Sequence, residues 1–233
     1  IACHSFDCRD EDAFLYLGCT RRGTPVSISR IATQADLRIL VGTIEPHPQA
    51  GFGGGFKNLL PGLAGAATIG HNHLLTPSAV RYNMIGTLPA ENPMRLDLEE
   101  AGRMIGGPTF IVNVVLDAAH RVVYLEAGEP VAAHGRLVEQ ARSLYQVPIE
   151  QQYDVVIGGV GYPKDANLYQ ACRAASYLYF APTPVVRPGG HLIVPARCQE
   201  GAGEGVGERR FLRAMRDAPD VQEGGLAARA RTG

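Results

Sequence analysis

The residues best suited to chemistry lie together in one stretch of the sequence, residues 42–73. This stretch contains three of the chain's seven histidines, His47, His71 and His73, and one of its two lysines, Lys57. A histidine changes its protonation state near neutral pH and also binds metals, so it can serve in acid–base catalysis or in a metal site. The stretch therefore predicts a functional site, and these residue types alone leave its chemistry open.

Glycines crowd the segment that precedes this lysine. Gly51, Gly53, Gly54 and Gly55 free the main chain to approach another group closely, and successive N–H groups can surround an anion. The segment differs from the phosphate-binding GxxxxGK[ST] loop, because Phe56 separates the glycines from the lysine. A loop that binds a ligand and a flexible surface loop are the two interpretations that remain.

The histidines also allow more than one interpretation. His47 lies between Pro46 and Pro48, which restrict its main chain and help to aim the ring. His71 and His73 would share one face of a strand and could then bind zinc, whereas in a helix only one of them could face the loop. No third ligand follows at a typical spacing, so a zinc site made of protein side chains alone is not expected.

Composition predicts an ordinary globular protein. The 233 residues are 45% hydrophobic and 19% charged with a net charge of -1, which indicates a sizeable core and gives no basic surface for nucleic acid or membranes. No apolar run could span a bilayer, and the start IACHSFDCRDED does not resemble a signal peptide. Five cysteines without a CxxC pair favour a reducing, cytoplasmic location.

Strands and helices alternate along the chain, which predicts an α/β fold with mainly parallel sheets. The glycine-rich segment directly follows an apolar strand within residues 35–44, and open α/β sheets bind ligands at the carboxyl ends of their strands. The helix within residues 165–180 is expected to have Asp165 as its N-terminal cap. Strands are expected within residues 13–20, 25–30, 35–44, 109–117, 121–128, 153–160 and 189–197, and helices within residues 92–107, 130–146 and 165–180.

The run PHPQAGFGGGFKNLLPG (46–62), followed by HNH (71–73), resembles the nickel-pincer-nucleotide lactate racemase family, whose active-site segment reads PHxxxGFSGGxKxxxPG. The segments LGCTRRGTPVSI (17–28) and YDVVIGGVGYPKDANLYQACRA (153–174) extend the likeness over nearly the whole chain. The resemblance implies an isomerase that racemises or epimerises a 2-hydroxy acid, with hydride moving from the substrate to the cofactor and back through a ketoacid. It also implies two α/β domains with the active site at their interface, and cofactor-maturation proteins as partners.

The resemblance implies a role for each residue of the stretch. Lys57 would form a thioamide with the nickel-pincer nucleotide, pyridinium-3-thioamide-5-thiocarboxylic acid mononucleotide. His73 would complete the coordination of Ni(II), and His47 would be one of two catalytic histidines. The glycines expected to lie against the cofactor are Gly53, Gly54 and Gly55.

A second patch, Tyr169, Gln170 and Arg173, is implied to contact the substrate. Tyr169 and Arg173 are four residues apart and so share a helix face. Arg173 stands where the family pattern leads us to expect a lysine, and arginine binds a carboxylate with two parallel hydrogen bonds. The alternative substrate is therefore a larger 2-hydroxy acid, such as a sugar acid or a dicarboxylate. A solvated arginine on an ordinary helix is the other interpretation.

The family's second catalytic histidine has no counterpart in this sequence. We therefore expect an internal fragment, with residues 1–148 as the later part of the cofactor-binding catalytic domain and residues 149–233 as the opening part of a C-terminal α/β domain. Such a fragment is expected to be inactive by itself. A homologue that binds the cofactor without catalysis is the remaining alternative.

Overall fold

The computed structural model describes residues 2–75, 84–181 and 183–217. They form two compact units, one made of the residues up to 75 together with Met84–Val147, and the other made of the described residues from Pro148 onward. The boundary predicted between 148 and 149 lies one residue from this division. The roles assigned to the two parts remain predictions.

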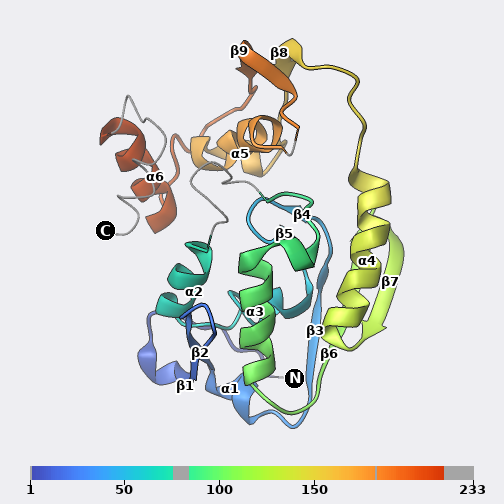
Figure 1. The fold of residues 1–233 in the computed structure, drawn as a ribbon. Coiled ribbons are helices and arrows are strands. Elements are labelled where there is room, and N and C mark those ends of the chain that lie inside the picture. The colour runs from blue at the N-terminus through green and yellow to red at the C-terminus, as the bar shows by residue number, and fades with distance from the viewer. Residues whose placement is uncertain (1, 76–83, 182, 218–233) are drawn as a thin grey trace. The chain divides into compact units, whose positions relative to one another are not determined.

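The first unit contains a three-stranded sheet with the strand order β3-β6-β7 (Figure 1). Strand β3 (Arg38–Thr43) runs parallel to β6 (Thr109–Leu116), and β6 pairs in the antiparallel direction with β7 (Val122–Gly128). Helix α4 (Pro130–Tyr145) lies along β6 and β7. Because successive side chains of a strand point to opposite faces, Ile111 and Val115 of β6 are both buried on one face.

Two helices and a hairpin complete the part of this unit that surrounds the site. The hairpin pairs β1 (Phe14–Cys19) with β2 (Pro25–Ser29), and α2 (Ala66–His73) lies beside α3 (Pro93–Met104). Asn92 caps α3 as predicted, since its side chain accepts a hydrogen bond from the Arg95 amide at 2.9 Å. The short elements of the unit are η1 (Glu11–Ala13), α1 (Arg30–Gln34), β4 (Pro46–His47), β5 (Gly51–Phe52), η2 (Gly55–Asn58) and η3 (Pro89–Glu91).

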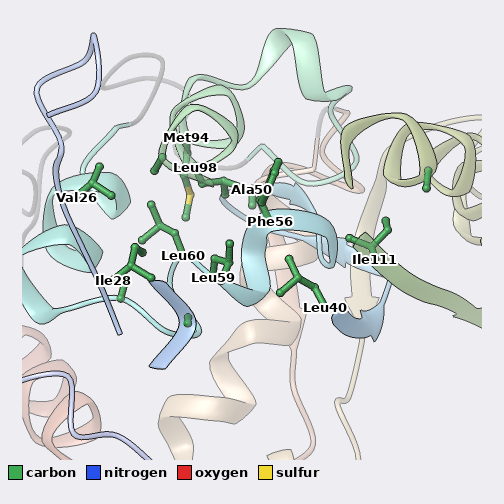
Figure 2. Packing of buried hydrophobic residues seen from close by; sticks show 14 residues of the cluster. Val26, Ile28, Leu40, Ala50, Phe56, Leu59, Leu60, Met94, Leu98 and Ile111 are labelled. Carbon is green, nitrogen blue, oxygen red and sulfur yellow. The ribbon is translucent and has the colours of Figure 1, made fainter. Parts of the chain in front are cut away.

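The main hydrophobic core lies between the glycine-rich loop and α3. Figure 2 shows Phe56, Leu59 and Leu60, which flank or follow Lys57, gathered with Met94 and Leu98 of α3. All five side chains are buried. The apolar residues next to Lys57 therefore anchor its segment to the core.

The second unit contains β8 (Tyr153–Ile157) paired in parallel with β9 (Val186–Ile193), together with α5 (Leu168–Tyr179) and α6 (Val206–Asp217). Helix α5 begins later than predicted. Asn167 is its cap and accepts a hydrogen bond from the Gln170 amide at 3.0 Å, whereas Asp165 lies in the short turn η4 (Lys164–Ala166).

The α/β class predicted from the sequence is confirmed, but strands pair in both directions. Of the pairs in the described part of the chain, β3–β6 and β8–β9 are parallel, and β1–β2, β4–β5 and β6–β7 are antiparallel. The antiparallel pairs are joined by short turns, which cannot connect parallel neighbours. Within the described residues, no helix is both long enough and apolar enough to cross a bilayer.

Candidate functional site

Lys57 lies in a tight turn of main chain that follows the strand pair β4–β5. His47 on β4 pairs with Gly51 on β5, and η2 begins four residues later at Gly55. The amide of Lys57 donates to the carbonyl of Gly54 at 3.2 Å, and the Lys57 carbonyl accepts from the amide of Gly62 at 3.3 Å. The half-buried lysine is therefore held on both sides by its own main chain.

The glycines before Lys57 are required by the packing of the loop. Gly54 and Gly55 have φ angles of +69° and +62°, in the left-handed region that disfavours residues with a Cβ. A Cβ on Gly54 would lie 2.4 Å from Cδ1 of Ile44 and 2.7 Å from Oδ1 of Asn113, and one on Gly55 would lie 3.0 Å from Cδ2 of His134. Protein atoms already fill the space on these sides of the loop.

Arg95 of α3 holds this loop through hydrogen bonds to its carbonyls, and it was not among the residues predicted for the site. The side chain is 1% exposed and directs its donors at successive main-chain carbonyls. These carbonyls belong to Ala50 at 3.4 Å, Phe52, Gly53 at 3.4 Å and Gly54 at 3.2 Å. Burial lowers the pKa of the Arg95 guanidinium to about 10, and the nearby carboxylate of Glu99 opposes this shift. The side chain therefore stays charged at neutral pH beneath the loop.

Two further buried side chains hold the same loop. Oδ1 of Asn113 accepts from the amide of Gly55 at 2.8 Å, and Nε2 of His134 donates to the carbonyl of Gly53 at 2.9 Å. Burial and, to a smaller extent, the charge of Arg95 lower the pKa of His134 to about 3, while the hydrogen bond to Gly53 opposes the shift. His134 is therefore neutral at pH 7, with its proton on Nε2.

His73 presents the form of imidazole that a metal ion needs. Nδ1 lies 2.8 Å from the carbonyl of Ile69, which can only accept, so Nδ1 carries the proton and Nε2 keeps its lone pair. Metal-binding histidines are commonly fixed in this way through the other ring nitrogen. Burial lowers the pKa of His73, the hydrogen bond to Ile69 opposes that shift, and the positive charge of Lys57 adds to it. The amine of Lys57 therefore acts electrostatically on the ring of His73.

His71 has a different set of neighbours, as expected for the helical alternative. Its Nδ1 lies 2.9 Å from Oγ1 of Thr24, and the Thr24 hydroxyl donates its only proton to Asp97 at 2.8 Å. His71 is therefore the donor to Thr24. The two histidines of α2 contact different parts of the unit, so they do not form a shared metal site.

His47 is half-buried and has its Nδ1 occupied by main-chain donors. The amides of Gln49 and Ala50 lie 3.3 and 3.1 Å from this nitrogen. The neutral ring therefore carries its proton on Nε2. A proton acceptor needs an unprotonated nitrogen, so acceptance by His47 requires that the ring give up these two hydrogen bonds.

A buried carboxylate, Asp97, joins α3 to α2 and to the hairpin. It is 0% exposed and accepts from Nδ2 of Asn72 at 2.8 Å, from the hydroxyl of Thr20 at 2.5 Å and from the hydroxyl of Thr24. Asn72 is the residue directly before His73. The sequence analysis also missed this network, since charged residues such as Arg95 and Asp97 are seldom fully buried and no local pattern marks them.

The three predicted substrate residues lie together on α5 in the second unit. Nε of Arg173 donates to Oε1 of Gln170 at 2.9 Å, and the guanidinium lies 5.5 Å from the centre of the Tyr169 ring. The ring of Phe211 packs edge-on against Tyr169 at 5.5 Å. Tyr169 and Gln170 therefore orient the arginine.

The side chains around Lys57 could contribute to a metal site that has further ligands of another origin. Within residues 2–75, 84–181 and 183–217, no group of three or more His, Cys, Asp or Glu side chains could hold a metal ion by itself. His73 offers one fixed nitrogen donor, and Lys57 offers an amine whose charge acts on that ring. This donor set fits a group that brings its own metal ligands and is attached at Lys57.

Comparison with known proteins places the chain among characterised relatives. Residues 1–84 match the model of the lactate racemase N-terminal domain. The chain is 33% identical over 215 residues to the lactate racemase of Thermoanaerobacterium thermosaccharolyticum, covering 92% of this chain and 49% of that protein. It is 32% identical over 218 residues to the lactate racemase of Lactiplantibacillus plantarum, covering 92% of this chain and 48% of that protein.

A solved structure agrees with the sequence matches. The lactate racemase apoprotein from Thermoanaerobacterium thermosaccharolyticum superposes with a TM-score of 0.76 and 32% identity, over 91% of this chain and 48% of that one. The chain thus spans about half the length of the curated relatives that it matches.

Proposed function

This chain is a relative of the lactate racemases, and on that basis we propose that it forms part of a racemase or epimerase of 2-hydroxy acids that uses a nickel-pincer nucleotide. Lys57 would carry this cofactor as a thioamide, and His73 would be a ligand of its Ni(II) ion. The bound cofactor supplies a hydride acceptor for the α-carbon of the substrate. The chain's own residues hold the cofactor and move the proton of the substrate hydroxyl.

The electrostatic relation between Lys57 and His73 carries this proposal. The charge of Lys57 and burial both lower the pKa of His73, so the ring stays neutral, and its Nε2 lone pair is left available by the hydrogen bond from Nδ1 to Ile69. Imidazole is a suitable ligand for nickel, so this ring would be one ligand of the cofactor's Ni(II) ion. Thioamide formation would also remove the charge of Lys57 from beside His73, which favours metal binding by the ring.

We propose that His47 exchanges a proton with the substrate hydroxyl. Loss of that proton accompanies hydride transfer from the α-carbon, and the product of the two transfers is a planar ketoacid. Return of hydride to either face, with return of the proton, gives either enantiomer. Because Nδ1 of His47 accepts from the amides of Gln49 and Ala50, the accepting form of the ring must first release them.

Arg173 is compatible with two classes of substrate. Its Nε is occupied by Gln170, so a carboxylate would bind through the two Nη groups, in the paired geometry that arginine offers. Lactate has one carboxylate, and a sugar acid or a dicarboxylate has further groups for this side chain to bind. We propose lactate or a closely related 2-hydroxy acid as substrate, with the larger acids as the alternative.

The experiment uses the full-length protein matured by cofactor-maturation proteins, which are its proposed partners in the cytoplasm. The chain has two lysines, so Lys164→Ala is a matched control for Lys57→Ala. We expect intact-mass and peptide analysis to find a nucleotide adduct on the Lys57 peptide of the wild type and of Lys164→Ala, and none in Lys57→Ala. Unmodified Lys57 in active enzyme would contradict the proposal.

A panel of enantiopure 2-hydroxy acids then identifies the reaction. Turnover of lactate in both directions supports the first substrate class, and turnover of only sugar acids or dicarboxylates supports the alternative. A fully modified protein that converts no acid on the panel would identify a cofactor-binding homologue without catalysis.

A further inference from the structure

Helix α3 carries two buried charges of opposite sign, Arg95 and Asp97. They are 1% and 0% exposed. Residues two apart on a helix are separated by a rotation of about 200° around its axis, so their side chains lie on nearly opposite sides. Their hydrogen bonds accordingly reach different segments, the glycine-rich loop on one side and α2 with the hairpin on the other. The two segments reached in this way are the ones that carry Lys57 and His73.

Arg95 acts on the segment of Lys57 through a shared acceptor. Nη1 of Arg95 and the amide of Lys57 both donate to the carbonyl of Gly54, each at 3.2 Å. The other donors of Arg95 hold the carbonyls of Ala50, Phe52 and Gly53. The guanidinium therefore fixes the carbonyl that positions the main chain of Lys57.

The burial of this arginine is costly, and its hydrogen bonds offset the cost. In the part of the chain that the structure describes, no carboxylate forms an ion pair with Arg95 within 4.0 Å. Its charge is instead solvated by the carbonyls of the loop. Arginine suits this task because its planar fork presents five donors in a rigid arrangement, which lysine cannot reproduce.

Asp97 acts on the segment of His73 through Asn72. Nδ2 of Asn72 donates to Asp97 at 2.8 Å and to the carbonyl of Met94 at 3.2 Å, so the residue directly before His73 is bound to α3 twice. His71, the residue before Asn72, is connected to Asp97 through the Thr24 hydroxyl. These hydrogen bonds to α3 therefore fix the position and orientation of α2 next to His73.

We infer that α3 is the spacer of the cofactor site, in which Arg95 positions Lys57 and Asp97, acting through Asn72, positions His73. The inference rests on the proposed function for the roles of Lys57 and His73. A cofactor that is attached to an amine and coordinated by an imidazole needs a fixed separation between the two, although they lie on different segments. A single helix that is hydrogen-bonded to both segments supplies that separation.

The test separates the two sides of the spacer in the full-length protein. Arg95→Lys keeps the charge but loses the fork, and we expect attachment at Lys57 to slow by about 10²-fold, as for a reacting group misplaced by about 1 Å. Asp97→Asn keeps the size but removes the charge and one acceptor, and we expect attachment to be unchanged while the nickel bound per adduct weakens by about 10–100-fold. Peptide mass analysis and metal analysis give the two readouts.

Leu137→Ala is the matched control for general destabilisation, because Leu137 of α4 is fully buried in a hydrophobic cluster separate from the one that contains Phe56, Leu59 and Leu60. We expect it to change neither readout once the protein is folded. If Arg95→Lys and Asp97→Asn lose attachment and nickel together, to the same extent as Leu137→Ala, the spacer inference is wrong. Normal attachment and nickel binding in both variants would also overturn it.

A readout without cofactor keeps this inference distinct from the proposed function. In unloaded protein we expect Arg95→Lys to speed amide hydrogen exchange in residues 51–60 and Asp97→Asn to speed it in residues 66–73, each by about tenfold or more, because each variant releases one segment. If the wild type never acquires an adduct, the proposed function fails, and this exchange pattern alone decides whether α3 holds the two segments. Exchange that rises equally in both segments in both variants would refute the inference.

Discussion

Arg95 and Lys57 share one hydrogen-bond acceptor, the main-chain carbonyl of Gly54. The Nη1 group of Arg95 and the amide of Lys57 each lie 3.2 Å from this oxygen. The loop of Lys57 is therefore bound to the buried interior of the first unit through its carbonyls. Its stability should therefore depend on buried residues such as Arg95.

We expect Gly54→Ala to destabilise the protein by about 3 kcal/mol or more, because the new Cβ would be strained at a φ of +69° and would overlap Ile44 and Asn113. Gly135→Ala is the control, since Gly135 lies within α4 with no atom within 4 Å of a new Cβ. Alanine there should stabilise by up to about 1 kcal/mol. Urea unfolding of both variants measures the difference, and equal stabilities would contradict the packing of the loop.

The stability of the folded protein should decrease as the pH is lowered, because of His134. In the folded protein the ring is neutral, because burial and the charge of Arg95 lower its pKa to about 3. In the unfolded chain the ring takes up a proton near the ordinary pKa of 6.5. Stability is therefore lost as the pH falls from 6.5 towards 3. At pH 5 the expected loss is about 2 kcal/mol, from about 1.5 units at about 1.36 kcal/mol per unit.

Two variants assign this pH dependence to its residue. His134→Gln can still donate to Gly53 but does not titrate, so the difference in unfolding free energy between pH 7 and pH 5 should shrink by about 2 kcal/mol. Val138→Ala, on the same helix, removes buried methyl groups but no titrating group and should leave the difference unchanged. The assignment is wrong if the two variants have the same pH dependence.

His47 can be tested with two amide side chains that replace different ring nitrogens. In His47→Asn the amide oxygen can take the place of Nδ1 and accept from Gln49 and Ala50, whereas in His47→Gln the amide nitrogen can take the place of Nε2–H. Neither amide accepts a proton, so we expect both to lower turnover by about 10²–10⁴-fold. Turnover close to the wild type in His47→Gln would show that the residue serves only as a hydrogen-bond donor.

Arg173→Lys should weaken substrate binding more than it changes stability. The variant loses the Nε contact to Gln170 and the paired Nη donors, so we expect the KM of a 2-hydroxy acid to rise about tenfold, as for loss of a charge-assisted hydrogen bond. Arg187→Lys, which replaces an exposed arginine of the same unit, serves as the control. An unchanged KM in Arg173→Lys would favour the interpretation of a solvated surface arginine.

The sequence by itself determined the α/β class, the strands longer than two residues, helices α3, α4 and α5, and the resemblance to the lactate racemase family. These features depend on local signals, namely the period of apolar residues, the caps and the glycine-rich motif. The start of α5 was misplaced because Asp165 and Asn167 are both good caps, and only the path of the chain after η4 puts Asn167 at the end of the helix. The sequence also did not predict that β7 pairs in the antiparallel direction with β6, in the sheet that β3 joins in parallel.

Only the tertiary structure decided what holds the candidate site together. Arg95 binds carbonyls 41 to 45 positions earlier in the chain, and Asp97 binds Asn72 and Thr20, which are 25 and 77 positions away. A charged residue in a helix is most often exposed, and nothing in the sequence around these two marks them as buried. Which of His71 and His73 is affected by the charge of Lys57 likewise depends on how α2 packs. Contacts of this range depend on how distant segments pack, and no local pattern of residues encodes that packing.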